Sequence, residues 1–411
     1  MEKRAFDFKS QINKLNNVFK GEISTVITAT KVFDAVFSIA EKGKTLKYEV
    51  VSLESDYLKY GASVTSALKK AGVEFSVFLI NANELDFAKP EEVFSVKNSQ
   101  VIIIGGKDII SYVLFYVSKN NQGCHAVLTE PHAEGLLGKL VTVPDGGFVK
   151  VIDVEPLKTI ILDKDIINKA SGKSVAYAYI KSVGKAVALI DYKLALLVGS
   201  KKLDKIHYDR ARLAVTLISK INEYENFNEV LAYASILIAE VLASSNVLTT
   251  GGQMDVAHAL ELVYPNGDKS NIAYVAIDRT IKLYHSFFVN DLSNLFSVAD
   301  YNGDVSLLSK VSGKDASYFL NLLKIPTEKR RKLLNKLFAL TKNDFIKETS
   351  ALIKILPQIK SCYLLLKKER EGALNIKYAI IKNGITLAPY LSDAVSVLST
   401  MRDFGVLALA K

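Results

Sequence analysis

Apolar and polar positions along the first 155 residues form short apolar runs that alternate with stretches of helical spacing. The runs, rich in β-branched residues, predict five strands, at residues 24–28, 48–52, 75–80, 101–104 and 126–128. Amphipathic helices are predicted between them, for example over residues 32–42 and 62–71, the second ending at Gly72. Strands that alternate with helices in this way indicate a parallel sheet with helices on both faces.

The pattern changes near Pro156, where long helical periodicities take over. These predict helices over residues 174–198, 211–221, 228–243, 255–262, 328–340 and 343–355. A β-like hairpin from residues 362–367 and 377–382 and a terminal helix over residues 390–401 are expected to follow. The sequence therefore predicts two domains: an α/β domain over residues 1–155 and an α-helical domain over residues 156–411.

The composition indicates a folded protein of the cell interior. Of the 411 residues 49% are hydrophobic, with only 22 Gly and 8 Pro, which argues against intrinsic disorder. The apolar region 230–248 contains Glu240 and reads as a core helix rather than a membrane span. The first residues lack the apolar core of a signal peptide, and Cys124 and Cys362 match no zinc or redox spacing. We expect a cytoplasmic protein.

The net charge of +10 raises the question of nucleic-acid binding. The lysines are dispersed, however, and the densest cluster, residues 329–332, lies within an amphipathic helical pattern that favours a solvated helix face. Nucleic acid is therefore not an expected partner. A basic balance is compatible with a small phosphorylated ligand.

Two segments carry possible metal ligands within apolar helical patterns. Asp191 follows Lys185 in one segment, and His258 follows Gly251 in the other. A buried carboxylate requires a compensating cation or hydrogen-bond donors, which a metal or neighbouring protein groups can supply. A histidine on an apolar helix is either a ligand or a satisfied core residue. Spacing alone leaves both alternatives open.

Together these segments resemble the dehydroquinate synthase-like, iron-containing alcohol dehydrogenase superfamily, and within it most closely the glycerol-1-phosphate dehydrogenases. The family pattern K-x-x-A-x-x-D, followed by an aromatic residue, is matched by Lys185, Ala188, Asp191 and Tyr192. The pattern G-x-E-H-x-x-x-H-x-x-E is matched by Gly251, His258 and Glu261, with Gln253 and Met254 where Glu and His are common. The resemblance implies a Rossmann-like domain followed by an all-helical domain.

The same resemblance implies a zinc or iron ion held by Asp191 and His258. A second metal-binding His of the family corresponds to Asn271 here. An Asn carbonyl binds zinc weakly compared with imidazole, so Asn271 completes the predicted metal site only poorly.

A nucleotide site is implied by the turn that follows the predicted strand 101–104. Gly105, Gly106 and Lys107 correspond to a family segment that has three glycines and brings the backbone close to a pyrophosphate at a helix N-terminus. The third glycine is missing, as are the Asp and the Lys that follow it in the family. A plain Gly-Gly turn is the alternative.

The loop of residues 127–135 resembles the family's V-P-T-x-x-S-x-D-G loop, which lines nucleotide and substrate. Thr129 is accordingly predicted to bind the cofactor, NAD or NADP, while Glu134, Gly135 and Lys185 are predicted to line the substrate. An ordinary Pro-Gly loop is the alternative.

Two functions follow from the resemblance, and they leave open whether the chain is an enzyme. The first is an NAD(P)-dependent, metal-assisted dehydrogenase of the glycerol-1-phosphate type, acting on a small phosphorylated polyol or its ketone. The second is a catalytically inactive relative that serves as a binding or scaffold subunit, as the missing residues favour. In either case we expect a homo-oligomer or a partner protein.

Overall fold

The computed structural model describes residues 3–19, 22–81, 99–117, 123–145, 148–248, 251–289, 328–391 and 396–403. It leaves out the side chains of residues 142–151, 328–338, 340, 371 and 373. The chain forms two compact units, which interleave along the sequence. The first contains residues 1–145, 149–178 and 216–244, and the second contains residues 146–148, 179–215 and 245–411. A domain division between residues 155 and 156 remains a prediction.

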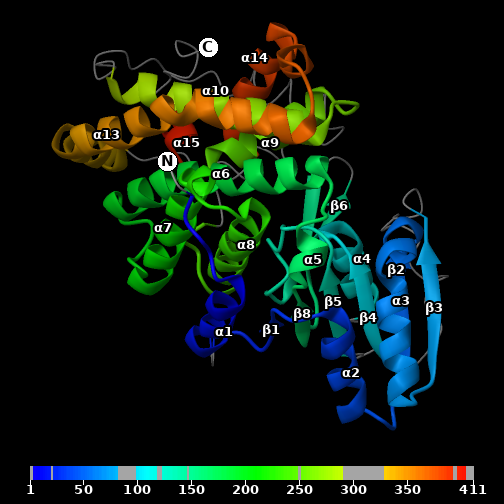
Figure 1. Cartoon of the computed structure of the whole chain (residues 1–411). Helices are drawn as coiled ribbons and strands as arrows, with labels where there is room; N and C mark the ends of the chain where they lie inside the picture. The colour runs from blue at the N-terminus through cyan, green and yellow to red at the C-terminus, as the bar shows by residue number, and fades with distance from the viewer. Residues whose placement is uncertain are drawn as a thin grey trace. The chain divides into compact units, whose positions relative to one another are not determined.

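The first unit contains a six-stranded sheet in the order β1-β8-β5-β4-β2-β3, in which every pair of neighbours is parallel (Figure 1). The strands are β1 Val26–Thr28, β2 Lys47–Leu53, β3 Phe75–Ile80, β4 Ser99–Gly105, β5 Gly123–Leu128 and β8 Thr159–Ile161. The five predicted strands are thus confirmed. A separate two-stranded sheet pairs β6 Leu140–Asp145 with β7 Phe148–Asp153.

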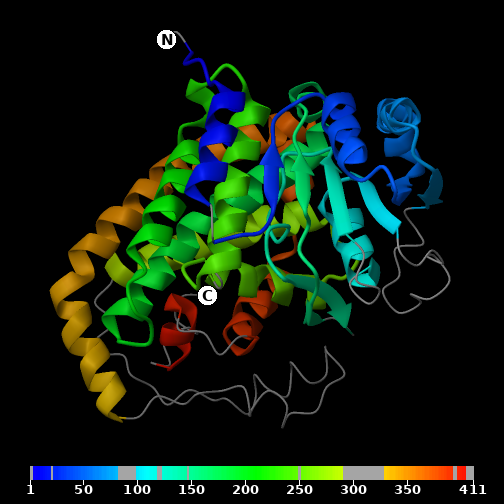
Figure 2. The same cartoon turned by 90° about the horizontal axis from the view of Figure 1, so that it is seen from below.

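Both faces of this sheet are covered, as the alternation of strands and helices predicts. Ile102 and Ile104 of β4 belong to a core cluster with residues of α2 (Val32–Lys42) and α3 (Glu54–Ala71). Val101 and Ile103 point to the opposite face and are equally buried. Further helices of this unit are α1 Phe8–Val18, α4 Lys107–Val117, α5 Lys164–Ile167 and α8 Phe227–Ser244. Figure 2 shows α1 beside β1.

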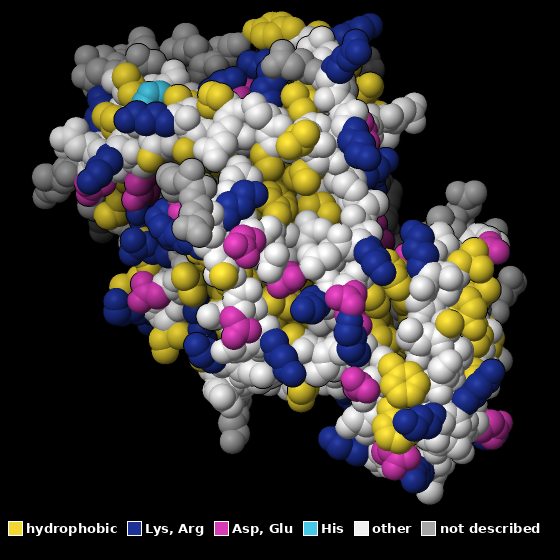
Figure 3. Space-filling model, viewed as in Figure 1, with side chains coloured by type: hydrophobic (Ala, Val, Ile, Leu, Met, Phe, Trp, Pro, Cys, Tyr) yellow, Lys and Arg dark blue, Asp and Glu magenta, His cyan; other side chains and the backbone are white. Residues whose placement is uncertain are grey.

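Among the described residues one helix, α8, is long and apolar enough to cross a membrane, and 72% of it is buried within the protein. The burial fits the core helix predicted for this region. Figure 3 shows basic and acidic side chains interspersed over one face of the molecule, in keeping with the dispersed lysines of the sequence.

The second unit is built from helices, which confirms the predicted C-terminal helical region. Its helices are α9 Gly252–Val263, α10 Lys269–Val289, α13 Glu328–Lys367, α14 Tyr378–Leu387 and α15 Val397–Asp403. α10 packs against both α9 and α13. Two helices, α6 Gly172–Leu197 and α7 Lys205–Ser219, have residues in both units.

Three expectations for this region are corrected. The hairpin predicted from residues 362–367 and 377–382 is wrong, because the first segment continues α13 and the second lies mostly in α14. Leu356, Ile359 and Tyr363 are buried at helical spacing, which explains why α13 extends through this segment as one helix instead of two. The terminal helix begins only at Val397, after a short 3-10 turn at Ala388–Tyr390.

Candidate functional site

The predicted nucleotide turn lies at the carboxyl ends of two adjacent parallel strands. Gly105 ends β4 and Lys107 begins α4, while Thr129 directly follows β5. The backbone N–H of Thr129 donates to the carbonyl oxygen of Gly105 at 3.0 Å. Gly135 has a φ of +82°, a conformation that favours glycine, and a Cβ there would lie 3.8 Å from Cε of Lys107. The structure thus brings the predicted cofactor residues together with Gly135.

A carboxylate of the protein itself occupies the N-terminus of α4. The side chain of Glu130 accepts a hydrogen bond from the backbone N–H of Lys107, at 2.8 Å to Oε1. A Cβ at Gly106 would meet Cδ and Oε1 of Glu130, each at 2.5 Å. The space that the glycine leaves open is therefore filled by Glu130. A helix N-terminus attracts anions, and here the anion is already supplied by the chain.

Further acidic groups surround Glu130. Burial raises its pKa, and the charges of Asp108 and Asp56 raise it further, while His132 and the Lys107 N–H lower it. Asp56 is partly buried, which raises its pKa, and its carboxylate forms a hydrogen bond with the Thr129 side chain. A pyrophosphate at this turn would lie close to these carboxyl groups. Lys107 is the one basic residue among the predicted cofactor-binding residues.

Glu134, predicted to line a substrate, lies in the loop after Thr129. Its carboxylate lies 3.8 Å from Nε2 of His132, whose side chain is buried. The loop is anchored through the backbone N–H of Ala133, which donates to the hydroxyl of Ser235 at 2.6 Å.

Asp191, the predicted metal ligand on α6, is fully surrounded by protein donors. Its Oδ1 accepts from the Val397 N–H at 2.7 Å, and its Oδ2 accepts from the Gly252 N–H at 2.8 Å. The hydroxyl of Tyr284 lies 2.9 Å from both oxygens. Val397 begins α15 and Gly252 begins α9, so one carboxylate caps two helices and binds a third, α10.

The side chain of Asp191 is 1% exposed. Burial raises the pKa of Asp191 to about 7, and the hydrogen bonds from Val397, Gly252 and Tyr284 act in the opposite direction. The neighbouring Asp255 is also buried, and its pKa is raised well above the ordinary value by burial and by Asp191, with Arg402 opposing. Three protein donors already face the two oxygens of Asp191 that a metal would need.

His258 lies on α9, is partly exposed, and is a neutral histidine at physiological pH. Burial lowers the pKa of His258 to about 4, and the positive charge of Lys181 lowers it further. Lys181 and Asp191 are both on α6, about 15 Å apart along the helix at about 1.5 Å per residue. Along α9, His258 lies six residues, about 9 Å, from Gly252, the residue that is bonded to Asp191.

Asn271, the third predicted ligand, belongs to a polar cluster at the start of α10. Its Oδ1 accepts from the hydroxyl of Tyr363 at 2.7 Å and from Nζ of Lys367 at 2.9 Å. The Lys367 side chain is 2% exposed and pairs with Asp268 at 3.2 Å. Since Tyr284 lies thirteen residues further along α10, Asn271 is about 20 Å from the helix position that contacts Asp191.

The residues that replace the family's Glu and His line a small cavity in the second unit. It has a volume of about 20 Å³ and is lined by Lys181, Gly184, Lys185, Gln253, Met254, Ala257, Ala273 and Ile277. The Lys185 side chain is 2% exposed, and its Nζ lies 3.9 Å from Sδ of Met254. Oε1 of Gln253 is buried and has no hydrogen-bond partner among the described residues. This volume suits one water molecule and is too small for a substrate.

These donor sets do not fit the groups that the family resemblance implies. The three predicted metal ligands are separated along α6, α9 and α10, and two of them are already bonded to protein donors. An ammonium group, that of Lys185, borders the cavity beside Met254, where a cation would be repelled. At the predicted nucleotide turn, the Lys107 N–H already donates to the carboxylate of Glu130.

Sequence reasoning missed the residues that decide this outcome. Glu130 is part of the loop of residues 127–135. Its position could have been noticed in the sequence, because it is an acidic residue two positions after the predicted strand 126–128. Tyr284 and Lys367 gave no signal, because they reach Asp191 and Asn271 from helices 93 and 96 residues away in the chain.

Comparison with known proteins places the chain among related sequences. No family model matches it. The glycerol-1-phosphate dehydrogenase [NAD(P)+] of Saccharolobus islandicus is 24% identical over 253 residues, covering 57% of this chain and 70% of the relative. That of Sulfolobus acidocaldarius is 25% identical over 210 residues, covering 47% and 58%.

Solved structures of the same fold can be superposed on nearly the whole chain. An iron-containing alcohol dehydrogenase from Thermococcus thioreducens superposes with a TM-score of 0.54 at 12% identity, covering 94% of this chain and 98% of the other. Maleylacetate reductase from Agrobacterium tumefaciens gives 0.53 at 12% identity, covering 93% and 94%. The chain has the fold of the dehydroquinate synthase-like, iron-containing alcohol dehydrogenase superfamily and is similar in sequence to glycerol-1-phosphate dehydrogenases.

Proposed function

We propose that this chain is a catalytically inactive relative of the glycerol-1-phosphate dehydrogenases that serves as a binding subunit. The observation that carries the proposal is the environment of Asp191, whose two oxygens accept hydrogen bonds from Val397, Gly252 and Tyr284. A carboxylate in this setting stabilises helix ends. Recruiting it to a metal would break several buried hydrogen bonds at once, each of which costs about 1–3 kcal/mol to leave unsatisfied.

The nucleotide turn supports the same proposal. Glu130 fills the open side of Gly106 and accepts a hydrogen bond from the Lys107 N–H, the donor that a cofactor phosphate would use. Binding of NAD or NADP at this turn would first require the displacement of a buried carboxyl group.

A metal-assisted, NAD(P)-dependent dehydrogenase acting on a small phosphorylated polyol or ketone is the second candidate. It is favoured by the similarity to glycerol-1-phosphate dehydrogenases over 253 residues. The clustering of Gly105, Gly106, Lys107 and Thr129 at the strand ends is also compatible with it. In this candidate the loop containing Glu130 would have to move.

The proposed binding subunit acts through a second copy of the chain or a partner protein. We place it in the cytoplasm, since Cys124 and Cys362 are both free thiols, as is usual in a reducing compartment.

A calorimetric titration separates the two candidates. The zinc-supplemented protein is titrated with NADH and with NADPH, and hydride transfer is then assayed with phosphorylated ketones. The inactive-relative proposal predicts no binding of either nucleotide up to millimolar concentrations. Micromolar binding together with turnover would overturn it in favour of the dehydrogenase.

A further inference from the structure

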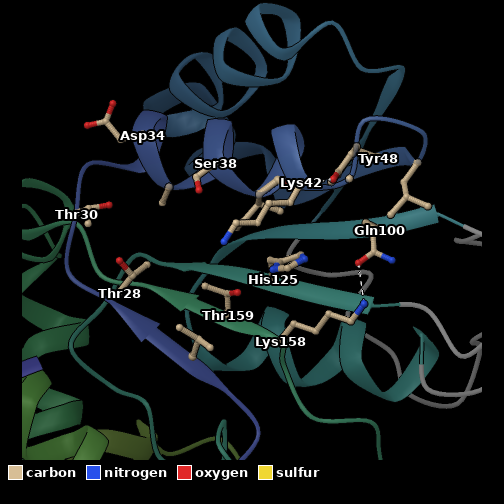
Figure 4. A pocket seen from close by; sticks show the side chains of 15 residues that line it. Thr28, Thr30, Asp34, Ser38, Lys42, Tyr48, Gln100, His125, Lys158 and Thr159 are labelled. Carbon is tan, nitrogen blue, oxygen red and sulfur yellow. Dashed lines mark hydrogen bonds between the residues drawn. The ribbon is translucent and has the colours of Figure 1, made fainter. Parts of the chain in front are cut away.

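A second pocket lies on the α2 face of the sheet in the first unit, and Gly105 and Gly106 are not among its lining residues. It has a volume of about 540 Å³, within the range of small-molecule sites. The lining residues are Val26, Thr28, Thr30, Asp34, Ala35, Ser38, Ile39, Lys42, Gly43, Leu46, Tyr48, Gln100, His125, Lys158 and Thr159. Helix α2 forms one wall, and strands β1, β8, β5 and β4 form the floor (Figure 4).

The strand register explains why polar side chains share this floor. His125 of β5 is opposite Thr159 of β8, and Thr159 is opposite Val26 of β1, so all three point to the α2 face. Further along the same face the side chains are apolar and form the core beneath α2 and α3. The polar positions are those that this core leaves uncovered.

His125 provides the strongest sign of a ligand. It is 7% exposed, and its Nδ1 is buried with no hydrogen-bond partner in the part of the chain that the structure describes. Burial lowers the pKa of His125 to about 4, helped by Lys158, so the ring is neutral at physiological pH. A neutral imidazole offers one N–H donor and one acceptor, which together suit a hydroxyl group. A buried polar atom without a partner costs about 1–3 kcal/mol, and a bound ligand would recover this energy.

The charged groups around the pocket favour an anion. Lys42 and Lys158 line it, and Asp34 is the one acidic residue in the lining, which leaves a net charge of +1 with His125 neutral. Nζ of Lys158 lies 3.1 Å from Oε1 of Gln100. A Cβ at Gly123 would collide with that ammonium group, so the glycine makes room for it above the sheet.

Hydroxyl groups in the pocket lining provide further hydrogen-bonding positions for a ligand. Thr28, Ser38 and Thr159 offer donors and acceptors around the floor and the α2 wall, as Figure 4 shows. We infer that this pocket binds a small hydroxylated organic anion, whose phosphate or carboxylate group is attracted by the positive charges of Lys42 and Lys158 and whose hydroxyl group bonds to His125.

This inference is independent of the proposed function. The pocket contains none of the residues of the nucleotide turn or of the predicted metal site. A negative result for one proposal therefore does not affect the other.

The test is a titration followed by NMR on protein whose histidine rings are labelled with ¹³C. The resonance of His125 is identified with a His125→Gln variant or, if that variant does not fold, by elimination through variants of the other four histidines. Inorganic phosphate, gluconate and the neutral polyol xylitol are the three probes. Binding of phosphate alone would indicate a phosphorylated ligand, and binding of gluconate alone a carboxylate.

The expected result is a saturable shift of the His125 resonance with one or both anions and none with xylitol. The affinity should fall at least about tenfold in Lys42→Ala and in Lys158→Ala, since each removes one of the two positive charges that attract the anion. Lys44→Ala is the matched control, because Lys44 is outside the pocket and pairs with Glu41 at 3.0 Å. No shift with either anion, a shift only with xylitol, or equal affinities in all three variants would overturn the inference.

Discussion

Glu130 lies at the turn where a cofactor phosphate was predicted to bind, and Asp191 is the carboxylate that was predicted to hold a metal. Each accepts a backbone N–H at a helix start, from Lys107 in one case and from Gly252 and Val397 in the other. Acidic side chains stabilise helix N-termini by compensating unpaired N–H groups and the helix dipole. Both residues therefore contribute to folding through contacts that compete with ligand binding.

Replacing Glu130 by Ala should expose an anion site at α4. The variant frees the Lys107 N–H and the space beside Gly106. We expect its affinity for pyrophosphate to rise at least about tenfold, at a cost in stability of about 1 kcal/mol for the lost cap. Calorimetry with pyrophosphate measures the first effect and urea unfolding the second. Glu134→Ala, in the same loop, serves as control, and equal pyrophosphate affinity in both variants would contradict the competition.

Replacing Asp191 by Asn should destabilise the protein strongly. The amide NH₂ group would face one of the donors that now point at the carboxylate, leaving buried groups unpaired. We expect a loss of about 2–5 kcal/mol in the free energy of unfolding. Asp209→Asn is the control, since Asp209 is exposed and makes a surface ion pair with Lys205 at 3.4 Å. A loss no larger than in this control would show that Asp191 is not a structural cap.

Asp191 also predicts a pH dependence of stability. Its pKa is about 7 in the folded protein, above the ordinary value of 3.8. Between these values the folded state binds more protons than the unfolded state, so this contribution to stability falls as pH rises from about 4 to 7, by up to about 1.4 kcal/mol per unit. His125 and His258, with pKa values lowered to about 4, act in the opposite direction over pH 4 to 6.5.

The comparison of wild type with Asp191→Asn isolates the Asp191 contribution, because both proteins share the two histidines. The difference between their free energies of unfolding should shrink from pH 4 to pH 7, as measured by urea unfolding at each pH. A difference that stays constant over this range would mean that Asp191 keeps its ordinary pKa.

Helices α6, α9, α10 and α15 are joined at one point by close packing as well as by hydrogen bonds. A Cβ at Gly252 would collide with the Tyr284 hydroxyl and lie 2.9 Å from Cδ1 of Leu398. Tyr284 has little freedom to move, because it is fully buried and bonded to Asp191. The first residue of α9 therefore has to be small for this arrangement to form.

Gly252→Ala should destabilise the protein by about 1–3 kcal/mol through overpacking. Gly372→Ala is a matched substitution, because a Cβ at Gly372 meets nothing within 4 Å. Urea unfolding of both variants is the measurement. Equal stability of the two variants would show that the helices rearrange freely around residue 252.

The strands could be predicted from the sequence because each is a short apolar run bounded by polar or turn residues, as in Phe75–Ile80, where prediction and structure coincide. The hairpin predicted after residue 362 was wrong because β-favouring residues there belong to a helix that buries Ile359 and Tyr363. The sequence did not predict α10, although it supplies both Tyr284 and Asn271. Local pattern specifies local structure, and long-range packing overrides it where a helix is covered on several sides.

For the molecule as a whole, the fold could be predicted, and the state of its sites could not. The family resemblance rests on residues such as Lys185, Asp191 and His258, whose spacing along the chain is family-like. Which donors surround Asp191 depends on Gly252, Tyr284 and Val397, which are brought to it from 61 to 206 residues away. The family-like spacing along the chain therefore does not specify which groups bond to Asp191 in the folded protein.

The most direct test is a measurement of bound metal in the full chain and in a His258→Gln variant. Both proteins are supplemented with zinc or ferrous iron, dialysed, and their metal content is determined by mass spectrometry. With Asp191 used as a helix cap and His258 as a neutral histidine without a metal, we predict far less than one ion per chain and the same content in both proteins. One tightly held ion per chain that is lost in His258→Gln would contradict the account and restore the metal-dependent dehydrogenase.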